Sequence, residues 1–413
     1  MVTDSTLSKA GLRRVLTVLC VTEITSWGVL FYAFTVLAPG IAAARGWSAS
    51  TVTAAFSVAQ VTSALTGIVV GRVLDRVGPR PVMTAGSIVA VPALVLIAET
   101  TALPWYFVGW FGVGLAMSGT LYSPAFAALT RWWGARRVTA LTAVTITAGL
   151  SSTVFAPLTA LLAGWFDYRG VYLILAAVLG VITIPLHAFG LRGPWPPAER
   201  QHVSTHAPEL IARSRPFILL AIALACAAFA IYGVVVIQVP LLIERGMSTG
   251  TAALALGLGG VGQLFGRVGY GRLTAATSVR TRTAIVLGAA AASIALLAAL
   301  PGPATLLIAA AMLVGVTRGV FTLLQATAIT DRWGPAHYGR LNGLLGAPTL
   351  TVTALAPWAC TALAESLGGY PVVFGLLAGL TALGAILGTA STRAAERQAG
   401  AARANRVCLP EGI

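Results

Sequence analysis

The chain has 413 residues, of which 57% are hydrophobic and only 9% charged, and its mean hydropathy is +0.86. Soluble domains carry roughly 25% charged residues, so this chain cannot cover a water-facing surface. Its hydrophobicity also excludes disorder, which needs low hydrophobicity and high charge density. Strands of outer-membrane barrels alternate polar and apolar residues, whereas the apolar segments here are apolar on all sides. The composition therefore predicts an all-α polytopic membrane protein.

The net charge of +15 is, taken alone, typical of a nucleic-acid-binding protein. No basic stripe interleaved with aromatic residues occurs, and basic residues of polytopic proteins collect in cytoplasmic loops, so we expect no nucleic-acid partner. The four cysteines (Cys20, Cys226, Cys360 and Cys408) are far apart and fit no metal-binding spacing. No Walker motif is present. We therefore expect no metal, no cofactor and no use of ATP.

Twelve apolar runs follow one another along the chain, each about long enough to cross a membrane. They lie approximately at residues 12–39, 47–70, 81–98, 103–130, 138–164, 169–190, 216–243, 248–270, 283–300, 303–329, 341–364 and 370–390. A polar, proline-containing break separates the first six runs from the last six. This pattern predicts an N-terminal six-helix bundle, a cytoplasmic linker, a C-terminal six-helix bundle and a cytoplasmic tail, at 1–191, 192–215, 216–392 and 393–413.

The basic residues are distributed very unevenly between the two sides of the predicted membrane segment. If the N-terminus is cytoplasmic, 22 of the 27 basic residues fall on the cytoplasmic side, and only Arg45, Arg169 and Arg245 fall outside. Cytoplasmic loops of membrane proteins carry this excess. We therefore expect an integral protein of the bacterial cytoplasmic membrane with both termini in the cytoplasm.

An internal repeat relates the two halves at a fixed offset of 200 residues. Tyr32 corresponds to Tyr232, Arg45-Gly46 to Arg245-Gly246, Arg80 to Arg280, Trp133-Gly134 to Trp333-Gly334, and Ala156-Pro157 to Ala356-Pro357. Matches at one offset across several helices indicate duplication of a six-helix unit. Two parallel halves of this kind are a transporter architecture, with the substrate site at their interface.

The segment between the second and third runs reads Gly71-Arg72-Val73-Leu74-Asp75-Arg76-Val77-Gly78-Pro79-Arg80. It resembles the signature loop of the major facilitator superfamily, and the resemblance extends over the whole chain, with two pseudo-symmetric six-helix bundles. In that family the loop is a latch that holds the cytoplasmic side shut. The resemblance implies this role for Gly71, Asp75, Arg76 and Arg80; the alternative is a basic turn that only sets topology. Because Ala275 replaces Asp75 in the second copy, we expect a charged latch in the first half only.

The eighth run contains Gly262-Gln263-Leu264-Phe265-Gly266-Arg267. It resembles the eighth helix of the oxalate/formate antiporter and monocarboxylate transporter branch, where an Arg at this place binds the substrate carboxylate. The chain departs from the monocarboxylate pattern in having Gln263 where that branch has Asp. It also has no Lys after Lys9. The resemblance implies that the substrate is a small organic anion.

Arg267 and Arg318 are the two arginines inside predicted helices. An Arg in hydrocarbon costs at least ~2.5–3.5 kcal/mol, so it usually faces a cavity or a partner. Arg318 lies on the tenth helix, which lines the central cavity in this superfamily. It is therefore the first candidate for binding a substrate anion; the alternative is a structural role, either in an ion pair with Glu23 or in contact with a cluster of carbonyls at a helix break. Arg267 is the second candidate, although its place near the helix end also allows it to snorkel to the surface.

Glu23 is the one carboxylate well inside an apolar run. Burial changes the proton affinity of a carboxylate, as a proton-coupling group requires. We therefore expect Glu23 to be either the coupling site or the fixed partner of Arg318. Polar and aromatic residues of the pore helices complete the predicted site, namely Trp27, Tyr32, Tyr122, Tyr232, Gln263 and Gln325.

These observations together predict a monomeric secondary active transporter that moves a small organic anion, with H+ as the coupling ion. Its contacts would be that substrate and membrane lipid. The alternative function is a proton-driven exporter of hydrophobic drugs or metabolites. A membrane-embedded enzyme would need clustered His, Asp or Glu at one membrane face, and such a cluster is absent from the sequence. We therefore expect no enzymatic activity. A receptor without transport would not explain the two arginines inside helices.

Overall fold

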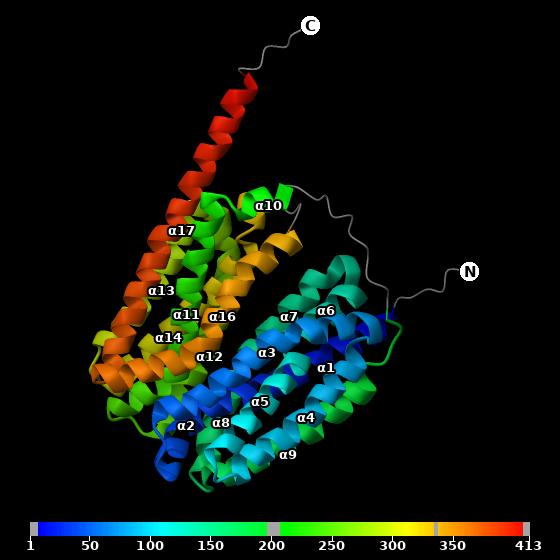
Figure 1. Cartoon of the computed structure of the whole chain (residues 1–413), viewed down its shortest axis with the longest axis vertical. Helices are drawn as coiled ribbons and strands as arrows, with labels where there is room; N and C mark the ends of the chain where they lie inside the picture. Colours follow the sequence, from blue (N-terminus) through cyan, green and yellow to red (C-terminus); the bar gives the residue numbers. More distant parts are fainter. Residues whose placement is uncertain (1–6, 196–206, 334–337, 408–413) are drawn as a thin grey trace.

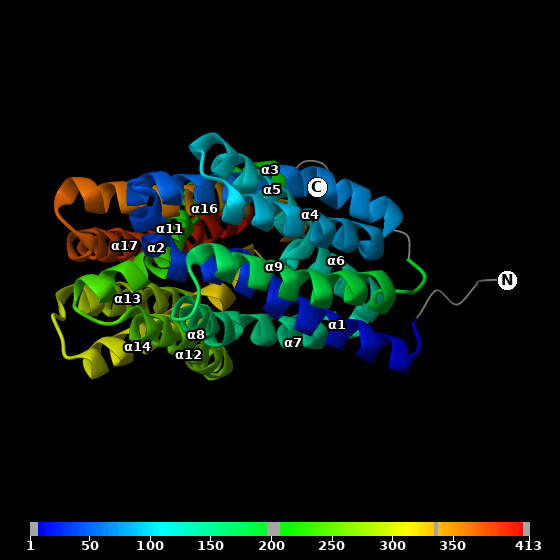
Figure 2. The same ribbon diagram turned by 90° about the horizontal axis from the view of Figure 1, so that it is seen from below.

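The computed structural model describes residues 7–195, 207–333 and 338–407, and within these ranges all regular structure is helical. The helices form two bundles that lie side by side (Figure 1). Seen from below, the long helices of both bundles run roughly along one common direction (Figure 2). The predicted all-α architecture of two pseudo-symmetric bundles is confirmed.

The first six crossings form the N-terminal bundle. The first crossing consists of three consecutive segments, α1 (Lys9–Trp27), the π-helical turn η1 (Gly28–Tyr32) and α2 (Ala33–Arg45). The others are α3 (Ala49–Val77), α4 (Pro79–Glu99), α5 (Leu103–Thr120) with α6 (Tyr122–Trp133), α7 (Arg137–Gly149) with α8 (Ser151–Ala163), and α9 (Tyr168–Pro185) with the π turn η3 (Leu186–Gly190). A short 3-10 turn, η2 (Gly134–Arg136), joins α6 to α7.

The C-terminal bundle contains the last six crossings. They are α11 (Arg215–Glu244), α12 (Thr249–Ala276), α13 (Val279–Ala299), α14 (Ala304–Thr327), α16 (Tyr338–Leu367) and α17 (Tyr370–Val407). Two short helices lie outside the crossings, α10 (Ala207–Ala212) in the predicted linker and α15 (Thr330–Trp333) after α14. Helix α17 continues through the predicted tail as far as Val407. The central part of the predicted linker, residues 196–206, lies outside the described residues.

Ten of the crossings are long and apolar enough to span a membrane by length and composition alone. The two that fall outside this set in the described chain are α5 with α6, which is interrupted at Leu121, and α12, which contains many glycines and Arg267. Both correspond to predicted apolar runs, at 103–130 and 248–270, and each lies in sequence between two apolar spans.

The duplication is visible in matching contacts. Arg45 donates to the carbonyl of Thr100, and its repeat equivalent Arg245 donates to the carbonyl of Leu300, which is itself the equivalent of Thr100. The following helices begin alike, because Ser48 accepts from the amide of Thr51 at 3.1 Å and Ser248 from the amide of Thr251 at 3.2 Å. Side-chain N-caps of this kind satisfy free amides and fix where a helix starts.

The two ends of the molecule differ. We call the end where α1 begins and α10 lies the linker end, and the end where α2 stops and α3 starts the far end. At the far end the bundles are joined, because the amide of Ser50 donates to Glu365 Oε1 at 2.9 Å and that of Trp358 to Ser57 Oγ at 3.1 Å. A third bond joins Thr153 Oγ1 to the carbonyl of Gly257 at 2.8 Å.

Toward the linker end the helices of the two bundles diverge (Figure 1). Along α3, Phe56 and Ala59 are buried, whereas Leu65, Ile68 and Val69 are exposed. Each hydrogen bond that the described residues form between the halves lies between the far end and Arg267. The bundles are therefore joined from the far end to mid-depth, and their helices separate toward the linker end.

Candidate functional site

A cavity of about 50 Å³ lies between the bundles at mid-depth. It is lined from both halves, by Trp27, Phe31, Tyr32, Tyr122, Ala148 and Gly149 of the N-terminal half and by Tyr232, Val235, Gln263, Arg267, Arg318 and Thr322 of the C-terminal half. Seven of the eight residues predicted from the sequence to bind substrate are therefore brought together here.

Close packing of α12 against α14 builds the wall with both arginines. A Cβ at Gly315 would overlap the carbonyl of Gly259, and a Cβ at Gly319 would overlap that of Gln263, so both positions require glycine. Small residues allow helix backbones to approach in this way. As a result Arg267, one turn after Gln263 on α12, faces the same cavity as Arg318 on α14.

Both guanidiniums reach across to the N-terminal half. Arg318 Nη2 donates to the hydroxyl of Tyr32, and the Arg318 Cζ lies 5.8 Å from the centroid of that ring. Arg267 Nη1 donates to the carbonyl of Thr145 and lies so close to Gly149 that a Cβ there would come within 2.9 Å of it. Over the ranges that the structure describes, neither arginine has a carboxylate within 4.0 Å. Both retain donors for an anion.

The N-terminal wall is aromatic. The ring centroids of Trp27 and Phe31 are 5.5 Å apart, those of Trp27 and Tyr122 are 5.0 Å apart, and those of Phe31 and Tyr32 are 5.2 Å apart. In a regular α-helix, residues five apart such as Trp27 and Tyr32 point about 140° away from each other. The π turn η1 between them changes this spacing, and both side chains line the cavity.

Glu23 lies one turn before Trp27, outside the residues that line the cavity. It is completely buried, and neither of its carboxylate oxygens has a hydrogen-bond partner among the described residues; the same holds for the Trp27 indole Nε1. Glu23 forms no ion pair with Arg318, so the structure does not support the alternative of a fixed Glu23–Arg318 pair.

Gln325 is the predicted binding residue that does not line the cavity. It lies seven residues after Arg318 on the same helix, which keeps it on the same face but moves it about 10 Å toward the linker end. Sequence reasoning in turn missed Phe31, Val235 and Thr322. The repeat could have indicated Thr322, because it is the equivalent of Tyr122 at the 200-residue offset.

The predicted latch lies at the linker end of the N-terminal bundle. Asp75 forms an ion pair with Arg131 of α6, and the backbone carbonyl of Asp75 accepts from Trp195 Nε1 at 3.2 Å. Arg80 Nε donates to the carbonyl of Ala188 at 2.7 Å, whereas Arg76 is exposed. A Cβ at Gly71 would meet nothing within 4 Å. In this conformation the contacts of Asp75 and Arg80 are thus within one half.

The C-terminal half also has an ion pair at its linker end, at positions outside the segment that is equivalent to the predicted latch. Arg282 at the start of α13 forms an ion pair with Asp331 of α15 at the linker end of the C-terminal half. The Arg332 guanidinium lies beside it and donates to Thr283 Oγ1 at 3.0 Å. Burial lowers the pKa of Arg332 to about 10, which leaves it charged at neutral pH. Arg282 and Asp331 both lie outside residues 271–280, the segment equivalent to the loop at 71–80, so the replacement of Asp75 by Ala275 gives no indication of this pair.

Across the described ranges, no group of three His, Cys, Asp or Glu side chains is placed to hold a metal ion. The fold and the cavity between two membrane-spanning bundles define an integral membrane transporter. The chain matches the Major Facilitator Superfamily over residues 19–303, which is more than half of its length, and it belongs to that family.

Comparisons with individual proteins indicate the same class of protein, a membrane transporter. The chain is 27% identical over 350 residues to Monocarboxylate transporter 13 of Rattus norvegicus, a match that covers 79% of this chain and 77% of that protein. Its fold is similar to that of a bacterial homolog of the human lysosomal transporter Spinster in an inward-facing, unoccupied conformation (TM-score 0.78, 15% identity, 95% of this chain and 99% of that one). It is also similar to the nucleoside transporter NupG (TM-score 0.74, 16% identity, 92% and 99%). These relatives are transporters.

Proposed function

We propose that this transporter moves a small organic anion, with a carboxylate as the group that it recognises, by alternating access. One observation carries the proposal: Arg318 and Arg267 line a single cavity without a carboxylate partner among the described residues. A planar guanidinium presents paired donors that match the two oxygens of a carboxylate. The resemblance to Monocarboxylate transporter 13, a relative named for this substrate class, supports it.

The proposed orientation places the linker end in the cytoplasm of a bacterial cell. The excess of Arg and Lys in the loops at that end supports this orientation. With it, the closed far end and diverging linker end correspond to an inward-facing state. The opposite state would require α3 and α16 to separate at the far end, where Ser50 now bonds to Glu365. Asp75 would then form its latch across the closed linker end.

Glu23 is the proposed proton-coupling residue. A buried carboxylate without a partner is costly in its charged form, so a change in its surroundings during transport would be accompanied by proton exchange. Its position one turn from Trp27, a cavity residue, links this exchange to the substrate site. The substrate anion and H+ would therefore move together.

The experiment is uptake of labelled small mono- and dicarboxylates into proteoliposomes under an imposed pH gradient. Replacing Arg318 by Ala removes a charge partner of the substrate, and we expect kcat/KM to fall by about 100-fold or more. Arg318→Lys keeps the charge but loses the paired donors, so it should retain part of the activity. Arg272→Gln, a change at an exposed arginine of α12, is the matched control and should leave uptake unchanged.

The alternative of a proton-driven exporter of hydrophobic compounds is favoured by the aromatic residues that line the cavity from both halves, namely Trp27, Phe31, Tyr32, Tyr122 and Tyr232. The same variants distinguish the two functions. An exporter of neutral compounds would keep its activity in Arg318→Ala, and none of the carboxylates would be taken up. That result would exclude the anion proposal and leave the transporter class intact.

A further inference from the structure

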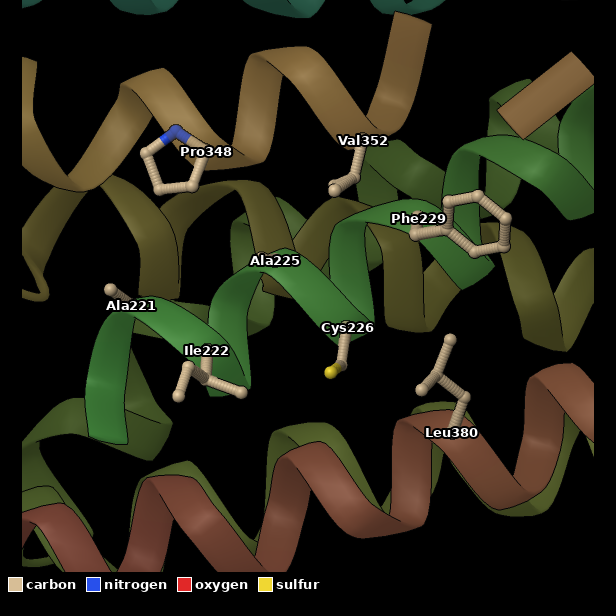
Figure 3. A pocket seen from close by; sticks show the side chains of 8 residues that line it. All are labelled: Ala221, Ile222, Ala225, Cys226, Phe229, Pro348, Val352 and Leu380. Atoms are coloured by element: carbon tan, nitrogen blue, oxygen red, sulfur yellow. The ribbon is translucent and has the colours of Figure 1, made fainter. Parts of the chain in front are cut away.

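A second cavity, of about 360 Å³, lies within the C-terminal bundle between α11, α16 and α17 (Figure 3). Ala221, Cys226 and Phe229 of α11, Pro348 and Val352 of α16 and Leu380 of α17 line it. It shares no residue with the cavity between the bundles. Its lining is apolar apart from the thiol of Cys226, so it offers nothing to the charged group of an anionic substrate.

The depth of this groove corresponds to the acyl-chain region of one membrane leaflet. Its α11 residues lie six to fourteen positions after Arg215, the first residue of that helix. At a rise of 1.5 Å per residue this is about 9–21 Å from the linker end. The hydrocarbon core of a bilayer is about 30 Å thick. An occupant of the groove therefore lies at the depth of the lipid hydrocarbon.

A charged residue lies directly above this groove on the same helix face. Arg215, Ile218, Ile222 and Cys226 are spaced by three or four residues, which places them on one side of α11. Arg215 is exposed, and Ile218 and Ile222 remain 47% and 46% exposed. An open apolar track therefore runs from a guanidinium at the linker end down to the cavity.

We propose that this groove binds one anionic phospholipid, with an acyl chain in the cavity and the phosphate at Arg215. The arrangement has the same polarity as the lipid: charge at the membrane surface and hydrocarbon below it. A basic side chain near the surface contributes about 1 kcal/mol toward an anionic lipid, which corresponds to about fivefold in affinity. Arg215 thus makes the site selective for a lipid with an anionic headgroup, and the apolar lining accommodates the acyl chain of that lipid.

Native mass spectrometry of the purified full-length protein tests this proposal, with phosphatidylglycerol and phosphatidylcholine of identical chains added at equal concentrations. We expect the wild type to retain phosphatidylglycerol about fivefold better. Arg215→Gln should bring the ratio close to one, and Arg215→Lys should preserve it. Ala225→Phe fills the groove from α11 and should reduce binding of both lipids. Ala225 is one of the residues labelled in Figure 3.

Two matched controls separate this site from general lipid contact. Arg272→Gln removes another exposed arginine at the linker end of the same half, and Val181→Phe enlarges a residue that is 74% exposed on α9 of the other bundle. Both should bind like the wild type. The proposal is overturned if Arg272→Gln lowers the ratio as much as Arg215→Gln, or if Ala225→Phe elutes as a folded protein and binds both lipids normally. Displacement of the lipid by glycerol phosphate alone would also overturn it, because the chain would then contribute nothing.

Discussion

At mid-depth the N-terminal half contributes aromatic rings and a nearby buried carboxylate to the site, whereas the C-terminal half contributes both guanidiniums. The repeat shows how complete this division is. Glu23 corresponds to Ala223, Arg318 to Ser118 and Arg267 to Gly67. Each charged position of the site thus has an uncharged equivalent in the other half.

The two halves also differ at the linker end. Each has an ion pair there, but the paired residues occupy different positions in the repeat. Arg131 supplies the cation in the N-terminal half, and its repeat equivalent Asp331 supplies the anion in the C-terminal half. The partners come from the end of α3 in one half and the start of α13 in the other. The halves therefore share the helix arrangement and the far-end contacts of Arg45 and Arg245, while their charges diverged.

The largest effect is expected when Glu23, the carboxylate that the N-terminal half places near the site, is removed. We expect Glu23→Gln to abolish the stimulation of uptake by a pH gradient, because the amide cannot exchange a proton. Exchange of internal for external substrate should continue, since the arginines are untouched. Uptake with and without the gradient, together with counterflow, measures both effects.

The control for Glu23→Gln is Ala223→Gln, which introduces the same amide at the equivalent buried position of the other half. It should leave the response to the gradient in place, even where added volume lowers the rate. A Glu23→Gln protein that still accumulates substrate in response to the gradient would assign the coupling to another group.

The two ion pairs at the linker ends should differ in their contribution to stability. The Arg282 side chain is only 4% exposed, so Asp331→Asn leaves a buried cation unpaired and should cost about 3–5 kcal/mol. Asp75 is 56% exposed, and Asp75→Asn should cost at most about 1 kcal/mol. Unfolding of the purified protein in detergent measures both.

Reversing the buried pair sharpens this test. Arg282→Asp combined with Asp331→Arg should recover part of the stability that Asp331→Asn loses, because the two charges again compensate each other. Equal losses in Asp331→Asn and Asp75→Asn would show that burial does not distinguish the pairs. A large loss of transport in Asp75→Asn without a loss of stability would instead agree with the proposed latch.

The fold was largely predictable because two features constrain it, the length of the apolar runs and a repeat with a fixed offset of 200 residues. Every predicted apolar run corresponds to a helical crossing, and the match to the superfamily agrees with the loop at 71–80. Breaks within crossings were not predicted. Leu121 is followed by Pro124 and flanked by Ser118, Thr120 and Ser123, a signal that the hydropathy pattern of the whole run concealed, whereas the π turn at Gly28–Tyr32 has no proline or polar cluster within it.

The candidate site was predictable in its residue types more than in its contacts. An Arg inside an apolar helix usually faces a cavity or a partner, and both Arg318 and Arg267 line the cavity between the bundles. The depth of a residue along its helix was harder to predict than the face on which it lies. Helical periodicity places Gln325 on the correct face of α14, but it does not show where along the helix the cavity ends. Partners were hardest. Arg76 follows Asp75 directly and so points elsewhere on the helix, whereas Arg131 approaches from α6, which only the tertiary structure shows.

The smallest expected effect compares two tyrosines that the repeat makes equivalent. Tyr32 accepts a hydrogen bond from Arg318, and no corresponding bond is formed by the Tyr232 hydroxyl to a described residue. Tyr32→Phe should raise KM for the anion about fivefold, which corresponds to the roughly 1 kcal/mol of a typical net hydrogen bond, with kcat little changed. Tyr232→Phe should stay within about twofold of the wild type, because it removes no bond to either arginine. Initial rates over a range of substrate concentrations separate KM from kcat. Equal effects of the two substitutions would mean that the phenol of Tyr32 does not orient Arg318, and the asymmetry of the site would then lie in its charges alone.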